Sequence, residues 1–178
     1  MQLILRERIT KLGRLGEVLA AEGLKRNGFT DVEDLNLRGV NHQFGDLLAT
    51  KNGVRHFIGV KTRNELRRGE IGMNEAYNLI LISNVANAEL KRQGETGDQI
   101  TEMLLAEVAD LGALYHATPA WITVAISAKA GTYSAYFGLV AALGNRRSVP
   151  MTLKAREDYL CLADNLTDRR VTVDLLNI

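Results

Sequence analysis

The sequence predicts a single mixed α/β domain with a central sheet flanked by helices. Two observations lead to this fold class: helix-type and strand-type apolar patterns alternate along the 178 residues, and one pair of strands is apolar on both faces. A chain of this length forms one domain, and its 46% hydrophobic and 24% charged residues are typical of a globular protein. We therefore expect residues 1–178 to be one domain.

The first predicted element is a helix over residues 4–27, which carries a stripe of small and apolar residues at helical spacing. Gly28 suits the end of this helix, and residues 31–37 are expected to form a strand. The residues of the stripe are Leu12, Leu15, Gly16, Leu19 and Gly23.

The clearest local signal is Asn52-Gly53, which stands between the apolar runs 44–51 and 54–61. A type I′ turn needs positive φ at both central residues, and this dipeptide adopts it readily. The two runs should therefore pair as antiparallel strands. Because the second run is apolar on both faces, we expect it to be a central strand with the first helix packed on one side.

The second half of the chain is predicted to add helices and then strands. Thr96 or Asp98 is placed to cap the longer helix. Residues 79–93 fit either a strand or a helix, and residues 152–163 fit neither type clearly. The predicted helices are 70–79 and 97–115, and the predicted strands are 121–129, 132–143 and 169–178.

The composition limits where the protein works and what it binds. Cys161 is the only cysteine, which argues for a reducing compartment, so we expect a cytoplasmic protein. The chain has no apolar run of about 18 residues, so no membrane association is expected. Because the net charge is only +1, nucleic acid would have to be bound by local patches. Basic residues cluster at Lys11 and Arg14, at Lys61, Arg63, Arg67 and Arg68, and at Arg146 and Arg147.

The hairpin also carries the residues best suited to chemistry. Counting outward from its two-residue loop puts Asp46 opposite Gly59 and Phe44 opposite Lys61, with Asp46, Gly59 and Lys61 on one face. An acid and a lysine on an apolar strand are costly to desolvate unless they pair or bind something. They form either a structural ion pair or a site where the carboxylate holds Mg²⁺ and the lysine assists hydrolysis of a phosphodiester.

Two segments, GRLGEVLAAEGLKRNGF and FGDLLATKNGVRHFIGVKTR, resemble the PD-(D/E)XK nuclease superfamily. Within it, they are most similar to Holliday-junction resolvases and small YraN-like bacterial proteins. Three features stand in the right order over residues 11–64: a helix with a glutamate, a strand containing GD, and a strand that continues as VKTR. The resemblance implies a restriction-endonuclease-like αβββαβ core, here with extra C-terminal strands, and a nuclease-like domain.

The resemblance assigns roles to three residues. Glu17 corresponds to the glutamate of the helix, Asp46 to the metal-binding aspartate, and Lys61 to the catalytic lysine. By its helical position alone, Glu17 is expected at the surface, because it lies about 140° from the centre of the apolar stripe at about 100° per residue. The chain departs from the family at Gly59, where the second metal-binding acid would stand.

A carboxylate from elsewhere could replace the missing acid. Glu75 resembles the acid that some restriction endonucleases place on the following helix, and Glu70 and Glu65 are alternatives. We expect Gly59 to leave room for such a side chain beside Asp46. On the same argument, Gly59→Glu should partly restore a protein that lacks Glu75.

The function implied is hydrolysis of DNA phosphodiester bonds with Mg²⁺, or Mn²⁺ as an alternative. Asp46 and Glu75 would be the metal ligands, and Asp46, Lys61, Glu17 and Glu75 the catalytic set. DNA is the expected partner, and a homodimer is left open. The alternative is a catalytically inactive nuclease-fold module that binds DNA or assembles with a partner protein. A third interpretation is an unrelated α/β protein in which the hairpin is accidental.

Overall fold

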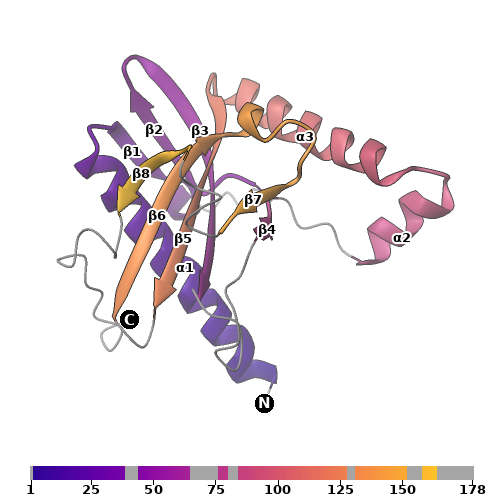
Figure 1. The fold of residues 1–178 in the computed structure, drawn as a ribbon, viewed down its shortest axis with the longest axis horizontal. Coiled ribbons are helices and arrows are strands. Elements are labelled where there is room, and N and C mark those ends of the chain that lie inside the picture. Colours follow the sequence, from indigo (N-terminus) through magenta and orange to yellow (C-terminus); the bar gives the residue numbers. More distant parts are fainter. Residues whose placement is uncertain are drawn as a thin grey trace.

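The computed structural model describes residues 2–38, 44–64, 76–79, 84–127, 131–151 and 158–163. Within these residues the centre of the molecule is a six-stranded mixed sheet with the strand order β1-β2-β3-β5-β6-β8 (Figure 1), and β4 pairs with β7 in a second sheet. The elements in chain order are α1 (Gln2–Arg26), β1 (Thr30–Asp34), the 3₁₀ helix η1 (Leu35–Arg38), β2 (Leu47–Lys51), β3 (Val54–Asn64), β4 (Ala76–Asn78), α2 (Asn84–Arg92), α3 (Gly97–Leu114), β5 (Thr118–Ser127), β6 (Thr132–Leu139), the 3₁₀ helix η2 (Val140–Leu143), β7 (Ser148–Pro150) and β8 (Leu160–Ala163).

The strand order confirms the predicted fold class. Strands β1, β2 and β3 pair in sequence as an antiparallel meander. Strand β5 then pairs parallel with β3, which requires a crossover connection, and α3 lies in that connection. Strands β6 and β8 extend the sheet in antiparallel fashion. The elements thus follow the predicted αβββαβ order, with β4 inserted before the helices and further strands after β5.

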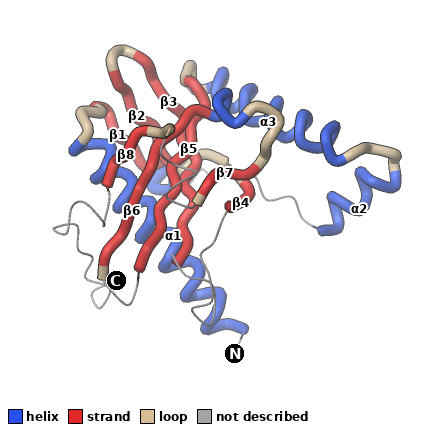
Figure 2. Tube along the Cα trace, viewed as in Figure 1, coloured by secondary structure: helices blue, strands red, loops and turns tan. Residues whose placement is uncertain are grey.

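Helices cover both faces of β3, as predicted for a central strand. On one face, Ile58 and Val60 pack with the apolar side of α1, including Leu15 and Leu19. On the other face, Phe57 belongs to a second cluster that includes buried residues of α3. Figure 2 shows the strands between α1 and the pair formed by α2 and α3, with α2 farther from the sheet. None of the helices in the described part of the chain is long and apolar enough to span a membrane.

Helix α1 approaches β3 very closely at Gly16. A Cβ atom built on Gly16 would lie 1.7 Å from Oγ1 of Thr62. Only glycine allows this approach, because any side chain would overlap Thr62. The contact sets the next residue, Glu17, beside the second half of β3.

The hairpin has the predicted turn and register. Asn52 and Gly53 have φ values of 51° and 77°, as a type I′ turn requires. Leu48 lies opposite Phe57, and Leu47 opposite Ile58. The first strand, however, begins at Leu47 rather than at residue 44.

The longer helix of the second half is confirmed, and two other predicted elements are corrected. Helix α3 begins at a capping box, in which the Thr96 hydroxyl accepts a hydrogen bond from the backbone N–H of Gln99, so Thr96 and not Asp98 is the cap. The helix expected over 70–79 is wrong for residues 76–78, which form β4 because Tyr77 pairs with Val149 of β7. The strand expected over 31–37 ends at Asp34, where a 3₁₀ turn begins. Residues 169–178 lie outside the described residues.

Candidate active site

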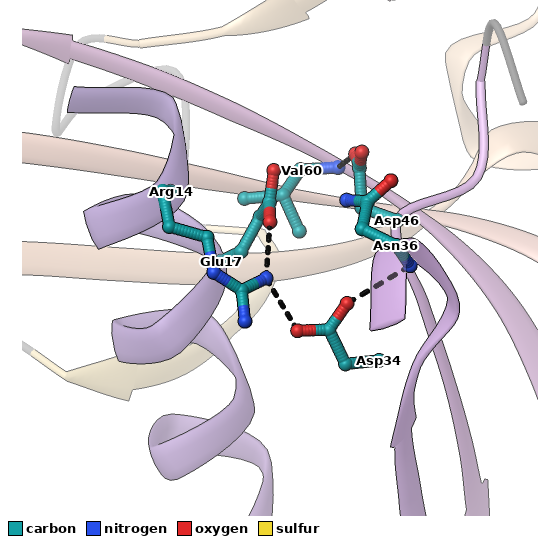
Figure 3. A network of polar contacts seen from close by, with 6 residues as sticks. All are labelled: Arg14, Glu17, Asp34, Asn36, Asp46 and Val60. Carbon is teal, nitrogen blue, oxygen red and sulfur yellow. Dashed lines mark hydrogen bonds and ion pairs between the residues drawn. The ribbon is translucent and has the colours of Figure 1, made fainter. Parts of the chain in front are cut away.

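Asp46 lies where β2 stops pairing with β3. Its backbone N–H donates to the carbonyl oxygen of Ile58 at 2.8 Å. Its side-chain Oδ2 accepts a hydrogen bond from the backbone N–H of Val60 at 2.7 Å (Figure 3). The carboxylate therefore takes the place of a backbone carbonyl of β2. The Asp46 carboxylate lies beside the edge of β3. Strand alternation predicted it above the face of β3, because the prediction assumed that the first strand of the hairpin began at residue 44, whereas β2 begins at Leu47.

Burial perturbs the protonation of both Asp46 and Lys61. Desolvation raises the pKa of Asp46 to about 6, although the Val60 N–H and the positive charge of Lys61 act to lower it. Desolvation also lowers the pKa of Lys61, against the opposing effect of the Asp46 charge. The two groups thus interact across a partly dehydrated space. Opposed shifts caused by burial beside a charged partner are typical of functional sites.

Glu17 joins this pair from α1. Its side chain is only 16% exposed, so the surface position expected from the helical stripe is wrong. The reason is that α1 contacts β1 as well as β3, which covers a wider part of the helix than the stripe. The negative charge of Glu17 acts to raise the pKa of Asp46 and of Lys61, which places all three residues within electrostatic reach.

A polar network anchors Glu17 and connects it to the neighbourhood of Asp46 (Figure 3). Arg14 Nη1 donates to Glu17 Oε2 at 2.8 Å and also to Oδ2 of Asp34. The other oxygen of Asp34 accepts from the backbone N–H of Asn36 at 3.0 Å. The Asn36 side chain in turn hydrogen-bonds to Asp46, which acts to lower the pKa of that carboxyl group.

Sequence reasoning missed Asp34 and Asn36 in this network and noted Arg14 only as part of a basic cluster. The strand β1 carries Asp34 at its end, and β1 pairs with β2, whose start is next to Asp46. An acid at the end of a predicted strand that neighbours the hairpin was the signal that could have pointed to Asp34. Nothing comparable in the sequence singles out Asn36.

Gly59 is not an empty position beside Asp46. A Cβ atom built there would lie 2.6 Å from the carbonyl oxygen of Phe44 and 2.7 Å from its ring. Phe44 therefore packs against Gly59 instead of lying opposite Lys61, and the room expected for an incoming acid is filled. The expected rescue by Gly59→Glu relied on this room, and a side chain at this position would have to displace Phe44.

The second metal ligand stays a prediction. Glu75 and its alternatives Glu70 and Glu65 lie outside the described residues. Among the residues that are described, no group of three or more His, Cys, Asp and Glu side chains is arranged to hold a metal ion. The chemistry of the donor set nevertheless fits a hard cation, because Asp46 offers carboxylate oxygen and the nearby Glu17 adds negative charge. A complete site requires at least one further carboxylate.

Comparisons with known proteins give one structural likeness. No protein-family model and no curated protein matches the sequence. Among solved structures, the chain is similar to Hjc of Archaeoglobus fulgidus, a Holliday junction resolvase from an archaeal hyperthermophile. The similarity covers 85% of this chain and 97% of that chain, with 15% sequence identity and a TM-score of 0.48. The fold assigned above rests on the strand order of this chain itself.

Proposed function

We propose that the protein is a metal-dependent nuclease that hydrolyses phosphodiester bonds of DNA. The observation that carries this proposal is the meeting of Asp46 and Lys61 in a desolvated space where β2 ends beside β3, with Glu17 within electrostatic reach. The αβββαβ order of the elements and the sequence resemblance to PD-(D/E)XK nucleases support the same activity.

Each residue has a distinct role in this proposal. Asp46, with Glu75 as the second ligand, would hold Mg²⁺ or Mn²⁺, and the negative charge of Glu17 would favour the cation. When bound, the metal supplies Lewis-acid stabilisation of the negative charge that develops on the phosphate. Lys61 lies within electrostatic reach of Asp46, where its ammonium group can orient the attacking water. Arg14 holds Glu17 in place through the 2.8 Å hydrogen bond.

Basic residues on β3 and in the segment before β7 support contact with a polyanionic backbone. Arg63 follows Lys61 by two residues on β3, so its side chain emerges on the same face. Its guanidinium lies 3.5 Å from the centroid of the Tyr77 ring, which orients it by a cation–π contact. Residues 131–151 contain Arg146 and Arg147 and no acidic residue. Such local positive charge is what DNA binding requires in a chain of net charge +1.

Cleavage of DNA by the wild-type protein and two variants tests the proposal. In Mg²⁺ or Mn²⁺, we expect the wild type to cleave and both Asp46→Ala and Lys61→Ala to lose turnover by at least about a hundredfold, as removal of one stabilising group commonly does. Asp46→Ala should also lose metal binding in a calorimetric titration. Lys61→Ala should keep it, because an ammonium group is not a metal ligand.

The matched controls are Asp98→Ala and Lys91→Ala, two exposed residues on α3 and α2. Both should cleave as the wild type does. Metal-dependent cleavage that survives Asp46→Ala would refute the site. A wild type that neither binds the metals nor cleaves DNA would favour the catalytically inactive module.

The second ligand is tested separately. Glu75→Ala should abolish both metal binding and cleavage, whereas Glu70→Ala and Glu65→Ala should keep both, since only one acid needs to replace the missing one at position 59. An active Glu75→Ala protein would exclude Glu75. The ligand would then be whichever of Glu70 and Glu65 is required.

A further inference from the structure

Arg63 of β3 carries a positive charge that no carboxylate among the described residues neutralises. Its side chain is partly exposed, and none of the ion pairs between described residues involves it. Instead, the Cζ atom of its guanidinium lies 3.5 Å from the centroid of the Tyr77 ring. A cation–π contact uses the charge of the guanidinium and leaves its N–H donors available to oxygen acceptors.

The register of β3 places Arg63 on the same side of the sheet as Lys61. Side chains alternate along a strand, so the two residues project to one face, about 6.6 Å apart along the strand. The charge of Arg63 acts to lower the pKa of Lys61, so the two cations lie within electrostatic reach of one another. Pairing of β2 with β3 ends at Leu47 and Ile58, so β2 does not cover this part of β3. An anion bound here would relieve the repulsion between the two cations.

Tyr77 reaches Arg63 from outside the six-stranded sheet. It lies in β4 and pairs with Val149 of β7, which in turn contacts β5 (Figure 1). The Tyr77 side chain packs against the apolar cluster that contains Phe57, whose side chain projects to the same face of β3 as Arg63. The ring therefore holds the guanidinium before any ligand arrives, which reduces the conformational entropy that binding would cost.

We propose that Arg63 binds the DNA phosphate next to the one that is cleaved, and that Tyr77 positions its guanidinium group. This inference rests on the proposed nuclease function. Lys61 would act at the cleaved phosphate, and the spacing of the two residues is close to the through-space separation of successive phosphates in one DNA strand. The planar guanidinium can donate two parallel hydrogen bonds to phosphate oxygens. Because this phosphate does not react, the contact is equally strong before and during cleavage, and it strengthens binding without accelerating the reaction.

The first test measures binding of a fluorescently labelled DNA duplex without divalent metal. Arg63→Ala should raise Kd about tenfold, as the loss of a charge-assisted hydrogen bond commonly does. The slope of log Kd against log salt concentration should fall by about 1, because one phosphate contact is lost. With Mg²⁺, the loss should appear in KM and not in kcat. The control is Arg55→Ala, which removes an exposed arginine at the hairpin end of β3 and should change neither Kd nor the slope.

The second test asks whether Tyr77 acts through Arg63. Tyr77→Leu should raise Kd about two- to fivefold, the range that a cation–π contact at an exposed site contributes. Tyr77→Phe keeps the ring and should keep the wild-type Kd. In the Arg63→Ala protein, Tyr77→Leu should have no further effect, because the group that the ring positions is already absent. A purely structural role of Tyr77 would weaken binding equally in both backgrounds.

The following results would overturn the proposal. Wild-type Kd and salt dependence in Arg63→Ala would exclude the phosphate contact and leave the nuclease function intact. A loss of kcat at unchanged KM would show that Arg63 acts at the cleaved phosphate. Equal effects of Arg55→Ala and Arg63→Ala would show a general effect of charge. If binding changes as expected but the wild type does not cleave DNA, Arg63 remains a phosphate contact and the proposed nuclease function is overturned instead.

Discussion

Asp46 holds its position through the backbone of the neighbouring strand. The bond from the Val60 N–H fixes one carboxylate oxygen, and burial holds the pKa of the group at about 6. Protonation of this carboxyl group therefore occurs within an accessible range of pH. Since only the ionised form is a good ligand for a hard cation, metal binding should depend on pH in that range.

The affinity for Mg²⁺ should fall as the pH is lowered through about 6, the pKa of Asp46. Below that value protons compete for the carboxylate, so each further pH unit should weaken binding by about tenfold. Above it, Asp46 is ionised and this dependence disappears. Calorimetric titration at pH 5, 6 and 8 measures the effect. Equal affinity of the wild type at all three values would show that Asp46 is not the ligand that titrates.

At the scale of elements, the site depends on how closely α1 lies against β3. Gly16 contacts Thr62, and this contact brings Glu17 toward Asp46 and Lys61. The packing of a helix at one position thus controls the electrostatics of a site that is built mainly on strands. A side chain at position 16 should therefore disturb both the packing of α1 on β3 and the electrostatics of the site.

Gly16→Ala should lower the free energy of unfolding by about 1–3 kcal/mol, because its Cβ would overlap the Thr62 side chain. Urea unfolding measures the change. Gly13→Ala in the same helix is the control, since its Cβ would meet no atom within 4 Å. That variant should be stabilised by about 0.5–1 kcal/mol through helix propensity. Thr62→Ala should recover part of the loss in Gly16→Ala, and additive losses would contradict the proposed overlap.

Local patterns predicted the elements that local interactions determine. The turn at Asn52-Gly53 and the cap at Thr96 are specified by neighbouring residues, and the structure has both. Strand β4 was missed, because Tyr77 pairs with Val149 from a distant part of the chain. The surroundings of Gly59 were missed for the same reason. The close approach of Phe44 depends on where β2 begins, which strand alternation does not show.

At the scale of the whole molecule, the candidate site gathers residues from three separate parts of the chain. Helix α1 supplies Glu17, the loop before β2 supplies Asp46, and β3 supplies Lys61. Sequence resemblance proposed these three because they match the motif of the PD-(D/E)XK nucleases in order, and the structure brings them within electrostatic reach of one another. It did not identify Asp34, whose contact with Arg14 arises only when β1 and α1 pack together.

The most direct test of the proposed metal site is a crystal structure of the wild-type protein with Mn²⁺, located by its anomalous scattering. We expect the ion to be bound by an Asp46 carboxylate oxygen, together with a second carboxylate oxygen from Glu75. Lys61 should lie near the ion without binding it. A crystal soaked to saturation that shows no anomalous peak at Asp46, and in which Asp46 and Lys61 form a closed ion pair, would contradict the proposed metal site.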